Sequence, residues 1–278
     1  MRAEDTPFPF YTSNLLSVPH GLFCCAGGTS DAPFASLNLS HSVGDHPDRV
    51  RINRERANDA LGLRHLIAVK QIHADQILQA EPAHIGTEQE GYDAIISTLP
   101  GTGVLIQQAD CQAVLLWAPQ HHVVAAIHCG WRGSVLNIIG KTVRCLSEQY
   151  DVPAESLRAV ISPSLGPCCA EFINYRTELP TWMHAYQIRP FFFDFWAISR
   201  HQLISVGVQP DHIETANMCT CCDQRFFSYR RATKSAQGIT GRNGSIIGLP
   251  ASTAVLSPGP QTRRSEEHTS ELQSHSFI

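Results

Sequence analysis

Two histidines and one cysteine, far apart in the sequence, have side chains that bind transition metals. They are His73 in KQIHADQIL, Cys111 in ADCQAVLLWAP and His128 in AIHCGWRG. Two imidazoles and a thiolate suit Zn²⁺, and three protein ligands leave a fourth position open, as in catalytic zinc sites. Spacing alone leaves the alternative open, in which these are satisfied core or surface histidines and a buried thiol.

Three charged residues stand near these candidates. Arg132, in GWRG, suits a phosphate because a guanidinium beside free backbone N–H groups binds anions, although a surface salt bridge is the alternative. Glu171 is a candidate general acid or base if it is buried near the metal; an exposed glutamate at a strand end is the alternative. Asp110, beside Cys111, either orients the site or caps a turn.

The chain has ten cysteines, and we find no secretory signal, so thiols or metal ligands are expected rather than a disulfide framework. Five of them form a second group: Cys168, Cys169, Cys219, Cys221 and Cys222. CxCC is a poor spacing for zinc, because adjacent cysteines rarely point at one ion and CxxC pairs are missing. We expect ordinary buried thiols or a redox-labile cluster there rather than a structural metal.

Short apolar runs predict the strands that position the three candidate ligands. These runs span residues 66–69, 104–106, 114–117 and 123–127. His73 is then expected at or just past the end of the first strand, and Cys111 and His128 at strand ends.

Two helices are expected. After GWRG, helical spacing of apolar residues predicts a helix capped by Ser134, which starts close to His128 and directs free N–H groups toward the site; these residues are Val135, Ile138, Ile139, Val143 and Leu146. Asp45 and Pro47 open a second helix that runs to about Leu61. Clustered strands with interspersed helices favour a single α+β domain, with mixed β-sheet layers flanked by helices in an α/β/β/α-like arrangement.

The composition indicates what kind of domain the chain forms and in which compartment we expect it. A chain of 278 residues, 43% hydrophobic and 17% charged, is typical of a globular protein, and a net charge of −4 gives no electrostatic case for nucleic acid. No stretch approaches the roughly 20 apolar residues of a membrane span, so we expect a cytoplasmic protein. The domain should cover residues 1–249. Residues 250–278 are polar and proline-containing, and they end in an adaptor-like RRSEEHTSELQS, which predicts a disordered, non-native tail.

Several longer segments, in order, resemble one family. KQIHADQIL, ADCQAVLLWAP, AIHCGWRG, SLGPCCAEF, CCDQRFFSYRR and TGRNGSIIGL are similar to segments of the laccase-domain (multicopper polyphenol oxidase-like) purine nucleoside phosphorylases, which include peptidoglycan editing factor-like bacterial members. The resemblance runs from about His20 to Leu249. It implies that His73, Cys111 and His128 are the metal ligands, with zinc as the cofactor and copper as an alternative. It also assigns substrate contacts to Asn38, in SLNLS, and Arg230, in SYRR, for which surface or turn roles are the alternative.

The chain departs from the family pattern at three places. Cys25 stands where the family has an arginine before its GG pair, Cys129 replaces the alanine of HAGWRG, and AEF at residues 170–172 replaces YEV. If the lost arginine holds substrate or phosphate, binding is weaker here or depends on a replacement such as Arg132 or Arg230.

The resemblance implies phosphorolysis of adenosine, inosine and methylthioadenosine, with adenosine deamination as a second activity. Its partners are then purine nucleosides and phosphate, and Cys111, His128, Arg132 and Glu171 are the candidate catalytic residues. The alternatives are a peptidoglycan editing factor acting on a muropeptide precursor, a copper-dependent polyphenol oxidase, a hydrolase with Cys111 as nucleophile, and a thiol-rich protein that binds metal structurally.

Overall fold

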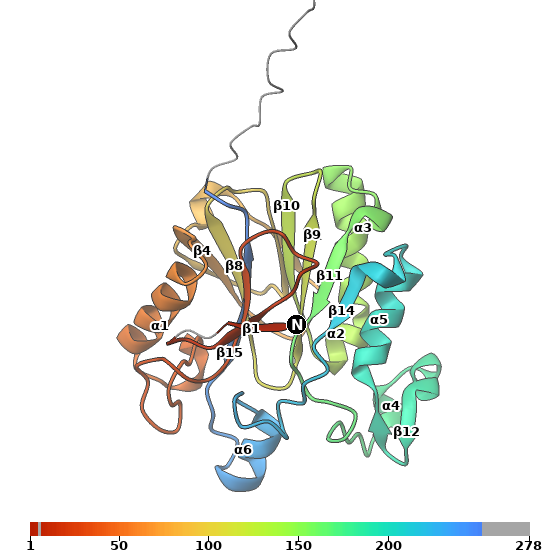
Figure 1. Cartoon of the computed structure of the whole chain (residues 1–278). Coiled ribbons are helices and arrows are strands. Elements are labelled where there is room, and N and C mark those ends of the chain that lie inside the picture. The colour runs from red at the N-terminus through yellow and green to blue at the C-terminus, as the bar shows by residue number, and fades with distance from the viewer. Residues whose placement is uncertain (5–6, 252–278) are drawn as a thin grey trace, which may run out of the picture.

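The computed structural model describes residues 1–4 and 7–251, and two β-sheets dominate it (Figure 1). The first sheet has seven strands. In spatial order they are β1 (Arg2–Glu4), β2 (Phe10–Thr12), β3 (His20–Phe23), β15 (Asn243–Gly248), β8 (Thr102–Gln108), β4 (His65–Lys70) and β6 (Glu88–Glu90). Strand β4 pairs in parallel with both of its neighbours, and the other pairs are antiparallel.

The second sheet has six strands. In spatial order they are β14 (Ile213–Thr215), β11 (Arg158–Ile161), β9 (Gln112–Ala118), β10 (Val123–Cys129), β7 (Ala94–Ser97) and β5 (Ile77–Gln79). The pairs at its two edges are parallel and the central ones are antiparallel. A separate small hairpin joins β12 (Gln187–Arg189) to β13 (Phe192–Phe193).

Helices cover the outer faces of the sheets: α1 (Pro47–Asp59) lies on the seven-stranded sheet, and α2 (Trp131–Leu136), α3 (Ile138–Tyr150) and α5 (Phe195–Ser205) lie on the six-stranded one. Two shorter helices, α4 (Tyr175–Glu178) and α6 (Tyr229–Ser235), lie below the sheets in Figure 1. Short 3-10 helices lie at His41–Val43, Pro82–His84, Ala154–Ser156, Thr181–Tyr186 and Pro210–His212. None of the helices in the described part of the chain is long and apolar enough to cross a membrane.

Three apolar layers hold the domain together. Between the sheets, Ile67, Val104 and Ile106 of the first sheet share one buried cluster with Leu115 and Val124 of the second. A second cluster joins the outer face of the six-stranded sheet to α3 and α5, and a third joins the seven-stranded sheet to α1. Because β8, β9 and β10 are covered on both faces, they are almost continuously buried, and their middle residues are apolar. The expected α+β fold, with sheet layers flanked by helices, is confirmed.

The helix predicted after GWRG is two helices. Asn137 separates α2 from α3 with a left-handed backbone (φ 55°), and its side chain accepts a hydrogen bond from the Gly140 N–H to cap α3. The expected cap, Ser134, is wrong, because it lies buried inside α2, whose N-cap is Gly130. Asparagine tolerates the left-handed region better than most residues, so it can turn the chain between two helices that apolar periodicity alone would join. Of the predicted tail, residues 250–278, all but residues 250 and 251 lie outside the described residues.

Candidate metal site and adjoining cavities

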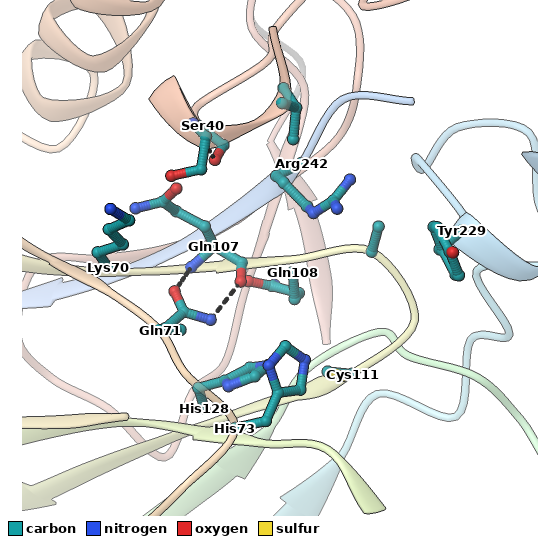
Figure 2. Close-up of a pocket in the computed structure, with 13 residues that line it drawn as sticks. Ser40, Lys70, Gln71, His73, Gln107, Gln108, Cys111, His128, Tyr229 and Arg242 are labelled. Carbon is teal, nitrogen blue, oxygen red and sulfur yellow. Dashed lines mark hydrogen bonds between the residues drawn. The ribbon is translucent and has the colours of Figure 1, made fainter. Parts of the chain in front are cut away.

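The structure brings His73, Cys111 and His128 to one place (Figure 2). Their ligand atoms all lie within 4.8 Å of one another, and the two imidazole rings meet edge to face with centroids 4.8 Å apart. His73 follows β4, Cys111 immediately precedes β9, and His128 lies on β10. His73 is exposed, Cys111 is half-buried and His128 is buried. The site is therefore open to solvent on one side and anchored in the sheet on the other.

Local backbone geometry makes this convergence possible. His73 and Asp110 have left-handed backbones, with φ of 60° and 85°, which turn the chain sharply beside each candidate ligand. Gly130 lies so close to Cys111 that a Cβ atom there would be 2.8 Å from the Cys111 Sγ. A side chain at position 130 would therefore displace the sulfur.

Asp93 orients both histidines from beneath the site. Its Oδ1 accepts a hydrogen bond from His128 Nδ1 at 2.8 Å and another from the His73 N–H at 2.9 Å, while Oδ2 accepts from the N–H groups of Ile72 and Ala74. The Asp93 side chain is fully buried. A carboxylate that holds one imidazole nitrogen leaves the other free to bind a metal, which is the usual second shell of histidine metal sites.

The site favours a thiolate beside an imidazolium in the absence of metal. Burial opposes ionisation of Cys111, but the positive His128 and hydrogen bonds from both imidazoles outweigh it and lower the pKa of Cys111 to about 6. Burial likewise opposes protonation of His128, but the Cys111 thiolate and the Asp93 carboxylate raise the pKa of His128 to about 9. The neighbouring Cys129, deep in the core, has a pKa raised by burial to about 12.

These residues fit a zinc ion by their chemistry. The donor set is two nitrogens and one readily ionised sulfur, an outer carboxylate fixes one imidazole, and one side of the site faces a cavity. Whether the three residues act as ligands stays a prediction.

A polar cavity of about 460 Å³ opens in front of the three residues (Figure 2). Lys70 and Arg242 bring positive charge to its wall, and Ser40, Gln71 and Gln107 bring neutral polar groups. Gln71 is fixed by two hydrogen bonds, since its Nε2 donates to the Gln107 carbonyl at 2.6 Å and its Oε1 accepts from the Gln107 N–H at 2.9 Å. This wall suits an anionic or hydroxyl-rich ligand.

A smaller, more apolar cavity of about 220 Å³ lies on the other side of Cys111. Trp131, Phe172 and Phe195 line it, together with Tyr229 and Arg230. Cys111 and Tyr229 line both cavities. An extended ligand with a flat apolar end and a polar end can therefore span the two and pass the candidate metal site.

The other residues expected from the sequence are placed as follows. Arg230 lines the apolar cavity, and its backbone N–H donates to Asp110 Oδ2 at 2.5 Å. Arg132 is exposed on α2 and its guanidinium stacks over Trp131; it is not among the residues that line these two cavities. Glu171 is exposed as well, and only its backbone carbonyl reaches Arg230.

Asn38 lies behind the polar cavity rather than on its wall. It is fully buried; its Oδ1 accepts hydrogen bonds from the backbone N–H groups of Ser40 and Arg242, and its Nδ2 donates to Asp45. In this structure Asn38 therefore positions two residues that line the cavity.

Sequence reasoning missed Asp93 and Arg242. Arg242, in TGRNG, places the positive charge in the polar cavity that the sequence suggested for Arg132 or Arg230. The signal was available, because an arginine between Gly241 and Asn243 just before a buried strand is a loop cation next to a rigid element. Cys25 is half-buried and its thiol faces the Gln224 carbonyl.

Of the two expectations for the second cysteine group, the one of ordinary buried thiols is wrong, and the one of a redox-labile cluster stays a prediction. Cys168 and Cys222 are exposed rather than buried, and their sulfurs gather with those of Cys169 and Cys219 within 4.8 Å. The sequence does not reveal this gathering, because it depends on two loops that lie far apart in the chain and meet only in the folded structure. Cys221 is not part of this group of four.

Solved structures of similar fold define the class of protein. YlmD from Geobacillus stearothermophilus superimposes with a TM-score of 0.81 at 28% identity, over 90% of this chain and 98% of that one. A hypothetical protein YfiH from Bacillus licheniformis gives 0.81 at 27% identity, over 89% and 98%. Both have the two-sheet architecture described above.

Sequence comparison reaches the same group. The profile of the family described as multi-copper polyphenol oxidoreductase laccase matches residues 19–250. A protein named purine nucleoside phosphorylase from Corynebacterium glutamicum is 31% identical over 81% of this chain and 92% of its own length. Purine nucleoside phosphorylase YfiH from Escherichia coli is also 31% identical, over 83% and 95%. The chain belongs to this laccase-domain family, as the sequence resemblance implied.

Proposed function

We propose that the protein is a zinc-dependent purine nucleoside phosphorylase that acts on adenosine, inosine and methylthioadenosine, with adenosine deamination as a side activity. The observation that carries the proposal is the His73, Cys111 and His128 set, flanked by one polar and one apolar cavity. The names of its relatives support an enzyme of this family. A zinc ion held by the three residues would supply Lewis-acid chemistry.

The two cavities bind different parts of the substrate. The purine occupies the apolar cavity, where Trp131 and Phe172 offer aromatic surface to a flat ring. The sugar and phosphate occupy the polar cavity, where Arg242 and Lys70 bind the anion and Ser40 and Gln107 contact hydroxyl groups. The glycosidic bond then lies near Cys111, which borders both cavities.

Phosphorolysis requires a phosphate held against the sugar carbon while the base departs. The transition state resembles an oxocarbenium ion, so an anion fixed beside that carbon both stabilises the developing charge and becomes the nucleophile. Arg242 is suited to hold it, because its guanidinium is anchored by the carbonyls of Thr240 and Gly241 at 3.0 and 3.1 Å. The catalytic roles that the resemblance assigns to Arg132 and Glu171 remain proposals.

The cellular location is also part of the proposal. All ten cysteines lie within the described residues and are free thiols, which suits the reducing cytoplasm. Purine nucleosides and inorganic phosphate are then the partners, and copper stays an alternative metal.

Elemental analysis followed by nucleoside turnover tests the proposal. Purified protein should contain zinc, and Cys111→Ser should lose the zinc bound by this set, because only two nitrogen ligands remain. Inosine should be cleaved only when phosphate is present, and adenosine should also give inosine without phosphate. Cleavage that ignores phosphate would point to a hydrolase or to the peptidoglycan-editing branch, and phenol oxidation that requires added copper would favour the oxidase alternative.

A further inference from the structure

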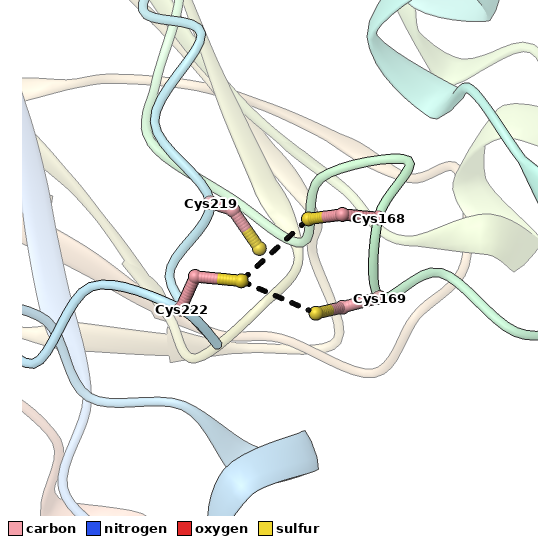
Figure 3. A group of neighbouring side chains, drawn as sticks. All are labelled: Cys168, Cys169, Cys219 and Cys222. Carbon is pink, nitrogen blue, oxygen red and sulfur yellow. Dashed lines mark hydrogen bonds between the residues drawn. The ribbon is translucent and has the colours of Figure 1, made fainter.

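Four cysteines outside the proposed active site form a compact group of sulfurs (Figure 3). Cys168 and Cys169 lie in the loop that follows β11, and Cys219 and Cys222 lie in the loop that follows β14. The Sγ of Cys222 is 3.6 Å from that of Cys168 and 3.5 Å from that of Cys169, and all four sulfurs lie within 4.8 Å of one another. All four are free thiols.

These separations match four ligands around one ion. Thiolates bound to zinc at about 2.3 Å in a tetrahedron are about 3.8 Å apart, whereas two sulfurs in a disulfide are about 2 Å apart. The vicinal pair is no obstacle here, since Cys168 and Cys169 both direct their sulfurs toward Cys222 (Figure 3). The loop turns between them, with the N–H groups of Cys169 and Ala170 both donating to the Gly166 carbonyl.

The backbone holds the two loops together without help from an ion. Ser164 pairs with the other loop, because its N–H donates to the Met218 carbonyl at 3.1 Å and its carbonyl accepts from the Thr220 N–H at 3.0 Å. A Cβ atom at Gly166 would lie 2.9 Å from the Cβ of Cys219, so only glycine permits this approach. Donors fixed in advance lose little entropy when they bind an ion.

The cluster also has the outer contacts of a thiolate site. The Gly166 N–H points at the Cys219 Sγ at 3.3 Å, and such N–H···S contacts stabilise negative sulfur. Arg231 braces the second loop, since its guanidinium donates to the carbonyls of Thr220 and Cys221. Two of the cysteines are exposed, so a metal ion can reach the cluster from solvent.

We propose that Cys168, Cys169, Cys219 and Cys222 bind a second, structural Zn²⁺. Four sulfur ligands in a tetrahedron close the coordination sphere, which is the hallmark of a structural rather than a catalytic zinc site. The inference does not depend on the proposed function.

Binding here acts on the active-site wall. Asp110, next to Cys111, accepts a hydrogen bond from the Thr220 hydroxyl at 2.7 Å, and its carbonyl accepts from the Leu165 N–H at 2.8 Å. Leu165 and Ala170, which flank the first pair of cysteines, line the apolar cavity. An ion bound by both loops therefore adds to the backbone pairing that already holds one wall of that cavity.

Counting zinc in matched variants tests the proposal. Full-length protein purified under reducing conditions should contain one zinc ion more per chain than Cys168→Ser/Cys222→Ser. The counts are about two against one if the His73, Cys111 and His128 set also binds zinc, and about one against none if it does not. Cys145→Ser is the control and should keep the wild-type count, because Cys145 lies on α3 and belongs to neither group. Cys111→Ser should contain about one in either case, and the triple variant none.

A second measurement covers the case in which the double variant fails to fold. Wild-type protein loaded with Co²⁺ should show strong thiolate-to-cobalt charge transfer from a four-sulfur site, at twice the cobalt stoichiometry of a one-site protein. The proposal is overturned if reduced wild-type protein binds one zinc that Cys111→Ser removes entirely. It is also overturned if the cluster binds iron in place of zinc, or if peptide mapping without added reductant finds disulfides among the four cysteines of protein purified under reducing conditions.

Discussion

At the scale of single residues, the candidate metal site depends on Asp93 as well as on its three proposed ligands. The buried carboxylate holds His128 through its ring and His73 through its backbone. We predict that Asp93→Asn weakens zinc binding about 10- to 100-fold, because the amide loses the charge that fixes the His128 ring. Competition with a chromogenic chelator measures this. Glu55→Gln, an exposed change on α1, is the control, and equal affinities in all three proteins would show that Asp93 does not act on the metal.

Ionisation of Cys111 gives a prediction for the metal-free protein. The lowered pKa of about 6 means that the thiolate is present above that pH and is lost as the pH falls through it. Because only the thiolate is alkylated, iodoacetamide should modify Cys111 half-maximally near pH 6, while Cys129, with its pKa of about 12, stays unmodified at neutral pH. Peptide mass spectrometry resolves the two. Half-maximal reaction of Cys111 near its ordinary value of 9.0 would mean that His128 does not stabilise the thiolate.

Two arginines are candidates for the contact with phosphate. Arg242 lines the polar cavity, whereas Arg132 is exposed and stacked on Trp131. We predict that Arg242→Gln reduces phosphorolysis at limiting phosphate about 10- to 100-fold, the loss of one charge-assisted contact worth about 1.5–3 kcal/mol, and affects deamination less. Arg132→Ala is the matched comparison. If it has the larger effect on phosphorolysis alone, the phosphate binds at α2, as the sequence first suggested.

The residues that sequence reasoning found and missed differ in a physical way. His73, Cys111 and His128 stand out because imidazole and thiolate have few roles and each lies at a predicted strand end. Asp93 carries no such mark, because aspartate is common and its role depends on hydrogen bonds to residues 20 and 35 positions away. The gathering of the four cysteines escaped sequence reasoning for the same reason, since Cys222 contacts residues 53 and 54 positions away.

At the scale of elements, the junction between α2 and α3 is set by one residue. We predict that Asn137→Ala lowers the free energy of unfolding by about 1–3 kcal/mol, because it removes the cap on α3 and forces alanine into a left-handed backbone. Asn137→Gly should cost much less, since glycine adopts that backbone freely. Urea unfolding compares the two, and similar losses would mean that the backbone conformation is unimportant there.

The sequence predicted the strands but not the junction between α2 and α3. Residues 104–106, 114–117 and 123–127 are buried runs of apolar and β-branched residues, and each lies inside a strand of the structure. Periodicity reports which face of an element is buried, but not where the chain turns within it. Asn137 ends α2 through its backbone and its own side chain, which the apolar pattern of residues 135–146 does not record.

At the scale of the whole molecule, stability depends on the layer between the sheets. Leu115, on β9, is fully buried in the cluster that both sheets share. We predict that Leu115→Ala lowers the free energy of unfolding by about 2–5 kcal/mol through lost burial and the cavity left behind. Leu136→Ala, at a site that is 40% exposed, should cost far less. Chemical denaturation checks both, and equal effects would show that the intersheet layer is loosely packed.

The path of the chain through the proposed metal site has a mechanical consequence. Residues 71–76, which include His73, carry the chain from β4 in one sheet to β5 in the other, and residues 109–111, which include Cys111, carry it from β8 to β9. His128 lies on a central strand of the second sheet. A metal ion bound by all three would link these two connections to β10. The two sheets could then not slide past each other without breaking a bond between the metal and one of its ligands. Under a pulling force, a metal–ligand bond should break before the strands separate. With cobalt bound in place of zinc, a change in its absorption spectrum would report this first movement of the sheets.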